Sequence, residues 1–152
     1  MLKRLHLTAS LLALLCIATF FVSTLLVESM GTRHSIAQLK QLIVSPGLWV
    51  LIPAMAVAGA SGMGLSQARQ GHLIASKKKR MPFIAANGLL VLVPCAIVLN
   101  RWASAGNFDT GFYLVQVIEL IAGATNLTLM GLNVRDGLRL TGRLQRAMPQ
   151  GR

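Results

Sequence analysis

Residues 66–82 read SQARQGHLIASKKKRMP, and this short connector lies between two long apolar runs. It carries five of the fifteen lysine and arginine residues, namely Arg69, Lys77, Lys78, Lys79 and Arg80. In a soluble protein such a run would be a solvated surface or a nucleic-acid patch. Because the flanking runs are long enough to cross a bilayer, the connector is instead typical of a cytoplasmic loop.

The overall composition indicates an integral membrane protein. Hydrophobic residues make up 54% of the 152 positions and charged residues only 12%, with a mean hydropathy of +0.62. A soluble domain of this size could not bury so much apolar surface. The net charge of +11 is concentrated in a few short segments. We therefore expect anionic lipid headgroups, and not nucleic acid, as partners of the basic residues.

Four apolar runs are long enough to cross about 30 Å of hydrocarbon. They predict helices over residues 7–27, 47–66, 82–100 and 112–133, within a single membrane domain that covers residues 1–152. Residues 34–44 have apolar positions at helical spacing, including Ile36 and Leu42, with Lys40 on the flank, and predict a helix along the outer interface. Ser45 and Pro46 are typical of the start of the next helix, and Asp109 or Thr110 can cap the last one. Residues 134–152 form a basic tail. The short connections favour an all-α, up-down-up-down four-helix bundle.

The distribution of basic residues predicts the orientation of this bundle. Twelve of them lie before the first run, in the connector or in the tail, and only Arg33, Lys40 and Arg101 lie on the other side. Basic residues concentrate in the cytoplasmic loops of membrane proteins. We therefore expect the N- and C-termini to be cytoplasmic.

A polar stripe runs along the helix predicted over 112–133. Gln116, Glu119, Asn126 and Asn133 recur at three- and four-residue spacing, so they share one face that should point toward protein. A carboxylate at the depth of Glu119 is costly in hydrocarbon unless it is protonated, paired or in a polar cavity. Two interpretations therefore stay open. The stripe forms hydrogen bonds between helices, with Asn87 as a partner, or it forms a proton or ligand site.

Small residues form a row on the helix predicted over 47–66. Ala54, Ala58 and Gly62 are spaced four apart, which lets another group approach the backbone closely. That group is a neighbouring helix, the same helix of a second subunit, or a flat cofactor. We expect a homodimer, the commonest closed assembly.

The three histidines are candidate metal ligands, and the predicted topology separates them. His6 and His72 both lie at the cytoplasmic interface, whereas His34 lies on the opposite side, ~30 Å away. Two imidazoles from different helices can ligate a b-type haem non-covalently, and Arg69 and Lys77 are close enough in sequence to bind its propionates. The alternative is that these interfacial histidines have no special role. His34 is the reserve ligand.

Three segments resemble the small bacterial four-helix membrane proteins that bind haem b and form homodimers. They are LHLTASLLALL, with histidine at the head of the first helix, QGHLIASKKKRMPFIAANG in the connector, and GATNLTLMGLNVRDG at the close of the last helix. The resemblance implies a bacterial inner membrane location, non-covalent haem b, a homodimer and an electron-transfer or haem-handling role. Such a haem would be the flat cofactor that packs on the row of small residues at Gly62. The redox partner is left open.

Two other functions compete with this expectation. The first is a small transporter or ion-coupling subunit built around Glu119 and Asn126, since ionisable groups inside a membrane mark ion pathways. The second is a structural or assembly membrane protein without a site of its own.

Overall fold

The computed structural model describes residues 1–67 and 72–140, and within these ranges the side chains of residues 66, 67, 72–78 and 140 are not described. All regular secondary structure in the described ranges is helical. The helices are α1 (Leu2–Met30), α2 (Arg33–Leu42), α3 (Leu48–Gln67), α4 (His72–Asn87), α5 (Val93–Ser104) and α6 (Thr110–Leu140). Four stretches are long and apolar enough to cross a membrane: Leu2–Met30, Arg33–Leu65, Lys79–Ser104 and Thr110–Arg139.

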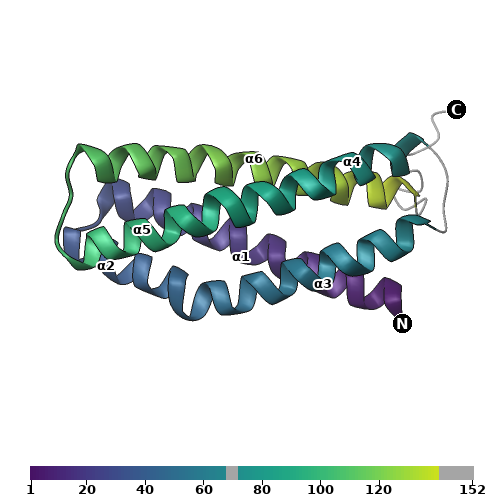
Figure 1. Ribbon diagram of the computed structural model, residues 1–152, viewed down its shortest axis with the longest axis horizontal. Coiled ribbons are helices and arrows are strands. Elements are labelled where there is room, and N and C mark those ends of the chain that lie inside the picture. The colour runs from purple at the N-terminus through teal and green to yellow at the C-terminus, as the bar shows by residue number, and fades with distance from the viewer. Residues whose placement is uncertain (68–71, 141–152) are drawn as a thin grey trace, which may run out of the picture.

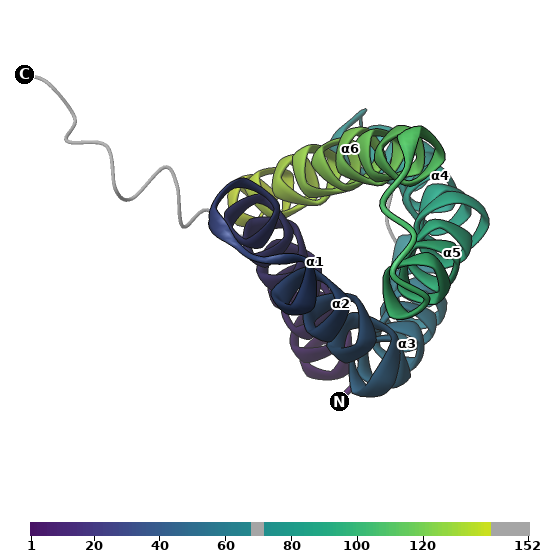
Figure 2. The ribbon, with the colours of Figure 1, turned by 90° about the vertical axis from the view of Figure 1, so that its left-hand side faces the viewer.

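The four long stretches run side by side along one axis and in alternating directions (Figure 1), so that α1 begins and α6 ends at the same end of the bundle. Viewed along this axis, the helices form a closed ring (Figure 2). Helix α1 packs most extensively on α3, while α6 contacts α1, α4 and α5. The short helix α2 packs against α5 and α1.

The third long stretch differs from its predicted bounds. A helix starting at Pro82 was expected, but α4 already begins at His72 and Pro82 lies inside it. Lysine and arginine are good helix formers, so the basic run extends the helix at the cost of one backbone hydrogen bond at the proline. The chain continues through a wide turn, Gly88–Leu92, into α5, where the Val93 N–H donates to the Gly88 carbonyl.

Local sequence signals account for the breaks between helices. Thr32 accepts a hydrogen bond from the Ser35 N–H and so caps the start of α2. Ser45, at φ −141° and ψ 113°, separates α2 from α3, because a residue before proline is driven from helical geometry. Asp109 accepts a 2.9 Å hydrogen bond from the Phe112 N–H at the start of α6. The sequence predicted the break at Ser45–Pro46 and a cap at Asp109 or Thr110.

The interior of the bundle combines small and polar side chains with a few large apolar ones such as Leu99 and Phe112, whereas many other large apolar side chains face outward. On α1, Ala9, Ala13, Ile17 and Thr24 are buried, whereas most of the leucines of this helix are exposed. This is the distribution expected for helices in lipid, where small residues permit close packing and leucine contacts acyl chains.

Helix α2 has an environment that the sequence analysis did not predict. It was expected over residues 34–44 along the outer interface, with Lys40 on its flank. In the structure Ile36 and Lys40 are buried, and Leu42, expected on the apolar face, is exposed. The helix is part of the packed bundle because its interior face contacts α5 and α1.

The row of small residues on α3 is occupied within the same chain. The Ala58 carbonyl accepts a 3.0 Å hydrogen bond from Nδ1 of His6 on α1. A Cβ atom added at Gly62 would lie 2.9 Å from Cε1 of His6 and closer still to Cε of Met81. The group that approaches this face is therefore a neighbouring helix.

We predict that Gly62→Leu lowers the unfolding midpoint of the purified protein in mild detergent. Overfilling a packed interface costs about 1–3 kcal/mol. Gly59→Leu, on the same helix, is the matched control, because a Cβ there meets nothing within 4 Å. Equal midpoints for the two variants would show that the α1–α3 contact at Gly62 is not as close as described.

Candidate functional site

A buried ion pair joins α2 to α6. Nζ of Lys40 lies 2.6 Å from Oε2 of Glu119, and the two side chains are 0% and 12% exposed, respectively. Both residues belong to stretches that can span a membrane. Charged groups at such a depth are costly unless paired, and they mark ion or proton sites in many membrane proteins.

The position of Lys40 follows from the periodicity of α2. Ile36, Lys40 and Ile43 are spaced by four and three residues, so they lie on one helix face, and all three are buried. Sequence analysis named Glu119 as a site residue but missed Lys40 as its partner. The available signal was a lone lysine on the apolar stripe of α2.

Gln116 extends the ion pair along α6. Its Nε2 donates a 3.0 Å hydrogen bond to Oε2 of Glu119. The side chain is 3% exposed, yet its Oε1 has no hydrogen-bond partner in the described part of the chain. A buried acceptor without a donor costs about 1–3 kcal/mol, so this site is incompletely satisfied.

Glu28 of α1 adds a second carboxylate to the site. It is close enough to Lys40 and Glu119 for both charges to act on it. Its Oε1 is also buried and has no hydrogen-bond partner among the described residues. Cys95 of α5 lies within electrostatic range of the same ion pair. We call Glu28, Lys40, Gln116 and Glu119 the charged cluster; it contains two carboxylates and one ammonium.

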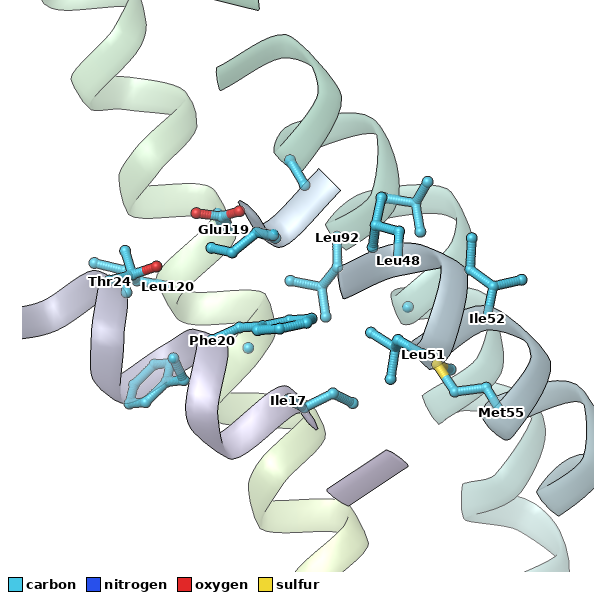
Figure 3. A pocket seen from close by; sticks show the side chains of 16 residues that line it. Ile17, Phe20, Thr24, Leu48, Leu51, Ile52, Met55, Leu92, Glu119 and Leu120 are labelled. Carbon is cyan, nitrogen blue, oxygen red and sulfur yellow. The ribbon is translucent and has the colours of Figure 1, made fainter. Parts of the chain in front are cut away.

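A small apolar cavity lies next to the charged cluster, between α1, α3, α6 and the Gly88–Leu92 turn. Glu119 and Thr24 lie on one side of it and Leu51 and Met55 on the other, with the ring of Phe20 between them (Figure 3). Its volume is about 60 Å³. A cavity of this size holds a few water molecules, whereas pockets for organic ligands measure roughly 300–1,000 Å³.

Of the remaining amides of the α6 stripe, Asn126 binds α4. Nδ2 of Asn87 donates 2.9 Å hydrogen bonds to Oδ1 of Asn126 and to the Ala122 carbonyl, and Asn126 is completely buried. Asn133 has a buried Oδ1 without a hydrogen-bond partner among the described residues. Within the polar stripe, Asn126 thus has Asn87 as its hydrogen-bond partner, as the sequence analysis proposed. Glu119 has a different partner, Lys40 of α2.

A second ion pair lies at the end of the bundle where α1 begins and α6 ends. Nη1 of Arg80 is 2.7 Å from Oδ2 of Asp136, and the Asp136 side chain is 2% exposed. Arg135 approaches the other carboxylate oxygen at 3.5 Å. This cluster joins α4 to α6 and was not predicted as a site.

His6 is the histidine whose ring geometry the structure describes best. A carbonyl can only accept, so the contact with Ala58 places a proton on Nδ1 and leaves the lone pair of the neutral ring on Nε2. Many metal-ligating histidines have this arrangement, so His6 itself is compatible with iron. Its predicted partner cannot be placed, because the side chains of His72 and Lys77 and all of Arg69 lie outside the described residues. His34 is exposed on α2.

No group of three or more histidine, cysteine, aspartate or glutamate side chains that could hold a metal ion occurs among the described residues. Comparisons with protein-family models, with curated proteins and with solved structures found no match. The haem interpretation therefore stays a prediction, and the charged cluster is the candidate site that the geometry defines.

We predict that Lys40→Met strongly destabilises the protein, because it leaves Glu119 buried without its cation. Removing one partner of a buried ion pair costs about 3–5 kcal/mol. Replacing both, in Lys40→Met with Glu119→Gln, should restore most of the lost stability. The measurement is the unfolding midpoint in detergent.

The control is Arg33→Met, which removes an exposed cation from the same helix and should have little effect. Its guanidinium lies 5.6 Å from the centre of the Phe108 ring, a weak surface contact. If Lys40→Met behaves like Arg33→Met, the ion pair makes no contribution to stability.

Proposed function

We propose that this protein is a small ion-coupling subunit or transporter of a membrane, and that its ion-responsive site is the Lys40–Glu119 pair. One observation carries the proposal: a lysine without exposed side-chain surface is paired with a glutamate inside a bundle whose helices can span a bilayer. Such groups respond to protons and ions because their charge is so costly at that depth.

A purely structural role is the weaker explanation of this pair. Well-packed apolar residues of similar volume stabilise a fold as well as, or better than, a buried ion pair. A structural pair would also have its neighbouring polar atoms satisfied, as native buried groups usually are. Here buried oxygens of Gln116 and Glu28 lack donors within the described chain.

The size of the adjacent cavity favours a proton or a small ion over an organic substrate. About 60 Å³ admits only a few water molecules. The cavity is lined almost entirely by apolar side chains, with Glu119 as its charged member. Transient water in such a cavity would give the charged cluster a route for proton exchange.

We place this protein in a bacterial inner membrane with both termini in the cytoplasm. The proposal is supported by the basic residues described at the end where α1 begins and α6 ends (Figure 1), which are Lys3, Arg4, Lys79, Arg80, Arg135 and Arg139. At the opposite end, Lys40 is neutralised by Glu119, so Arg33 and Arg101 are the remaining described cations. The basic end would bind anionic lipid headgroups.

The test is proton flux in liposomes that contain purified protein and a pH-sensitive dye. A potassium diffusion potential should drive faster internal pH changes in wild-type liposomes than in protein-free ones. Glu119→Gln should reduce the rate to the protein-free level, because the variant loses the Lys40–Glu119 ion pair on which the proposal rests. Asp109→Asn makes the same chemical change at an exposed cap and should retain the wild-type rate.

Equal flux in wild-type and protein-free liposomes would refute proton coupling. If Glu119→Gln keeps the wild-type rate, the proton flux does not depend on the Lys40–Glu119 pair.

A second candidate function is haem binding, and the His6–Ala58 hydrogen bond favours it. By fixing the proton on Nδ1, this bond sets the tautomer that histidines have when they ligate a metal through Nε2. In this proposal His6 and His72 ligate haem b, Arg69 and Lys77 bind its propionates, and the haem supplies one-electron chemistry in a homodimer. The face of α3 that includes Gly62 would contact His6 and not the second subunit.

The haem proposal predicts a low-spin haem spectrum for the purified wild-type protein, which changes on reduction. His6→Ala and His72→Ala should each lose bound haem, measured as pyridine haemochrome per polypeptide. His34→Ala, which removes an exposed histidine of α2, should keep it. A colourless wild-type protein, or full haem content in both variants, would eliminate this ligand pair.

A further inference from the structure

We infer that Glu28 holds the exchangeable proton of the charged cluster, so that α1 contributes the proton-binding group and the Lys40–Glu119 pair tunes it. This inference deepens the ion-coupling proposal and rests on it for its physiological meaning. The binding reaction is the addition of one proton to the Glu28 carboxylate, which becomes a neutral carboxyl group.

The first argument is the charge of the cluster. Glu119 is paired at 2.6 Å with Lys40, and Lys40 is the cation that faces Glu28. From the elements packed around it, Glu28 meets the charges of Lys40 on α2 and Glu119 on α6, while the Cys95 thiol of α5 lies near the same pair. With both carboxylates ionised, the cluster has one uncompensated negative charge. One proton makes it neutral, which lowers the cost of burial.

The second argument is the state of the hydrogen bonds. Gln116 is 3% exposed, and its Nε2 donates to Glu119 while its Oε1 has no donor in the described chain. Oε1 of Glu28 is likewise a buried acceptor without a donor. Both oxygens are acceptors only. A proton converts the Glu28 carboxyl into a donor, which the ionised carboxylate cannot be.

The third argument selects a proton over a sodium ion. Hard cations bound without water take several oxygen ligands, commonly six or more. Among the described residues, the unsatisfied oxygens of the cluster are those of Glu28 and Gln116, and the Lys40 ammonium already occupies the cationic position beside Glu119. Two oxygens are too few to coordinate such a cation, whereas a proton needs only one.

The geometry also separates the roles of the two glutamates. Oε2 of Glu119 receives hydrogen bonds from both Lys40 and Gln116. Oε1 of Glu28 receives none within the described chain. Glu28 is therefore the carboxyl group of the cluster that has a buried oxygen without a donor.

The test is infrared spectroscopy of the purified protein in lipid nanodiscs during a pH titration. We expect the carbonyl band of a protonated carboxyl group, sensitive to deuteration, to be present in the wild-type protein and to disappear on alkalinisation. The band should be absent in Glu28→Gln and unchanged in Asp109→Asn, the same chemical change at an exposed helix cap. Lys40→Met with Glu119→Gln should keep a band but shift its titration, because the tuning charges are gone.

A band that persists in Glu28→Gln would assign the proton to another group and overturn the inference. Loss of the wild-type band on replacing choline chloride with sodium chloride at constant pH would show that sodium displaces the proton, and would also overturn it. The two proposals can be refuted independently. A band that depends on Glu28 without proton flux would refute the coupling function but keep the proton site at Glu28. Proton flux with a band that does not depend on Glu28 would keep the coupling function but refute the proton site at Glu28.

Discussion

A buried lysine without exposed side-chain surface is the constraint on which the end of the bundle that contains α2 depends. Lys40 has to reach an anion, and Glu119 is the carboxylate that it meets. Satisfying this pair fixes the rotation of α2 about its own axis, which in turn buries Ile36 and Ile43 on the same face. In water the pair would contribute little, but where the solvent is hydrocarbon the alternative is an unpaired charge.

The sequence predicted the features that depend on local or one-dimensional information. Hydropathy located the four long stretches, proline after Ser45 located the break between α2 and α3, and Asp109 located the start of α6. The polar stripe of α6 was also visible, because three- and four-residue spacing puts Gln116, Glu119 and Asn126 on one face whatever they contact. Composition and periodicity are sufficient for such inferences.

The partners of that stripe were not predictable, because they depend on how each neighbouring helix is rotated. The apolar residues of α2 define two overlapping helix faces, and the sequence analysis took the face that includes Leu42 as the buried one. Lys40 was therefore assigned to a flank, whereas in the structure Lys40 is buried and Leu42 is exposed. The start of α4 was missed for a different reason. A run of charges and a proline resemble a loop, yet lysine and arginine extend a helix readily. Glu28 offered no pattern, because its neighbours come from other helices.

The contacts between α4 and α6 have a mechanical consequence. These helices are joined at two depths, by Asn87 with Asn126 and by Arg80 with Asp136. Sliding one helix along the other by a turn, about 5.4 Å, would break both contacts together. Shear between α4 and α6 therefore costs both contacts at once. Helix α2 is joined to α6 by the Lys40–Glu119 contact, so a change in the charge of this contact alters the link between α2 and the α4–α6 pair.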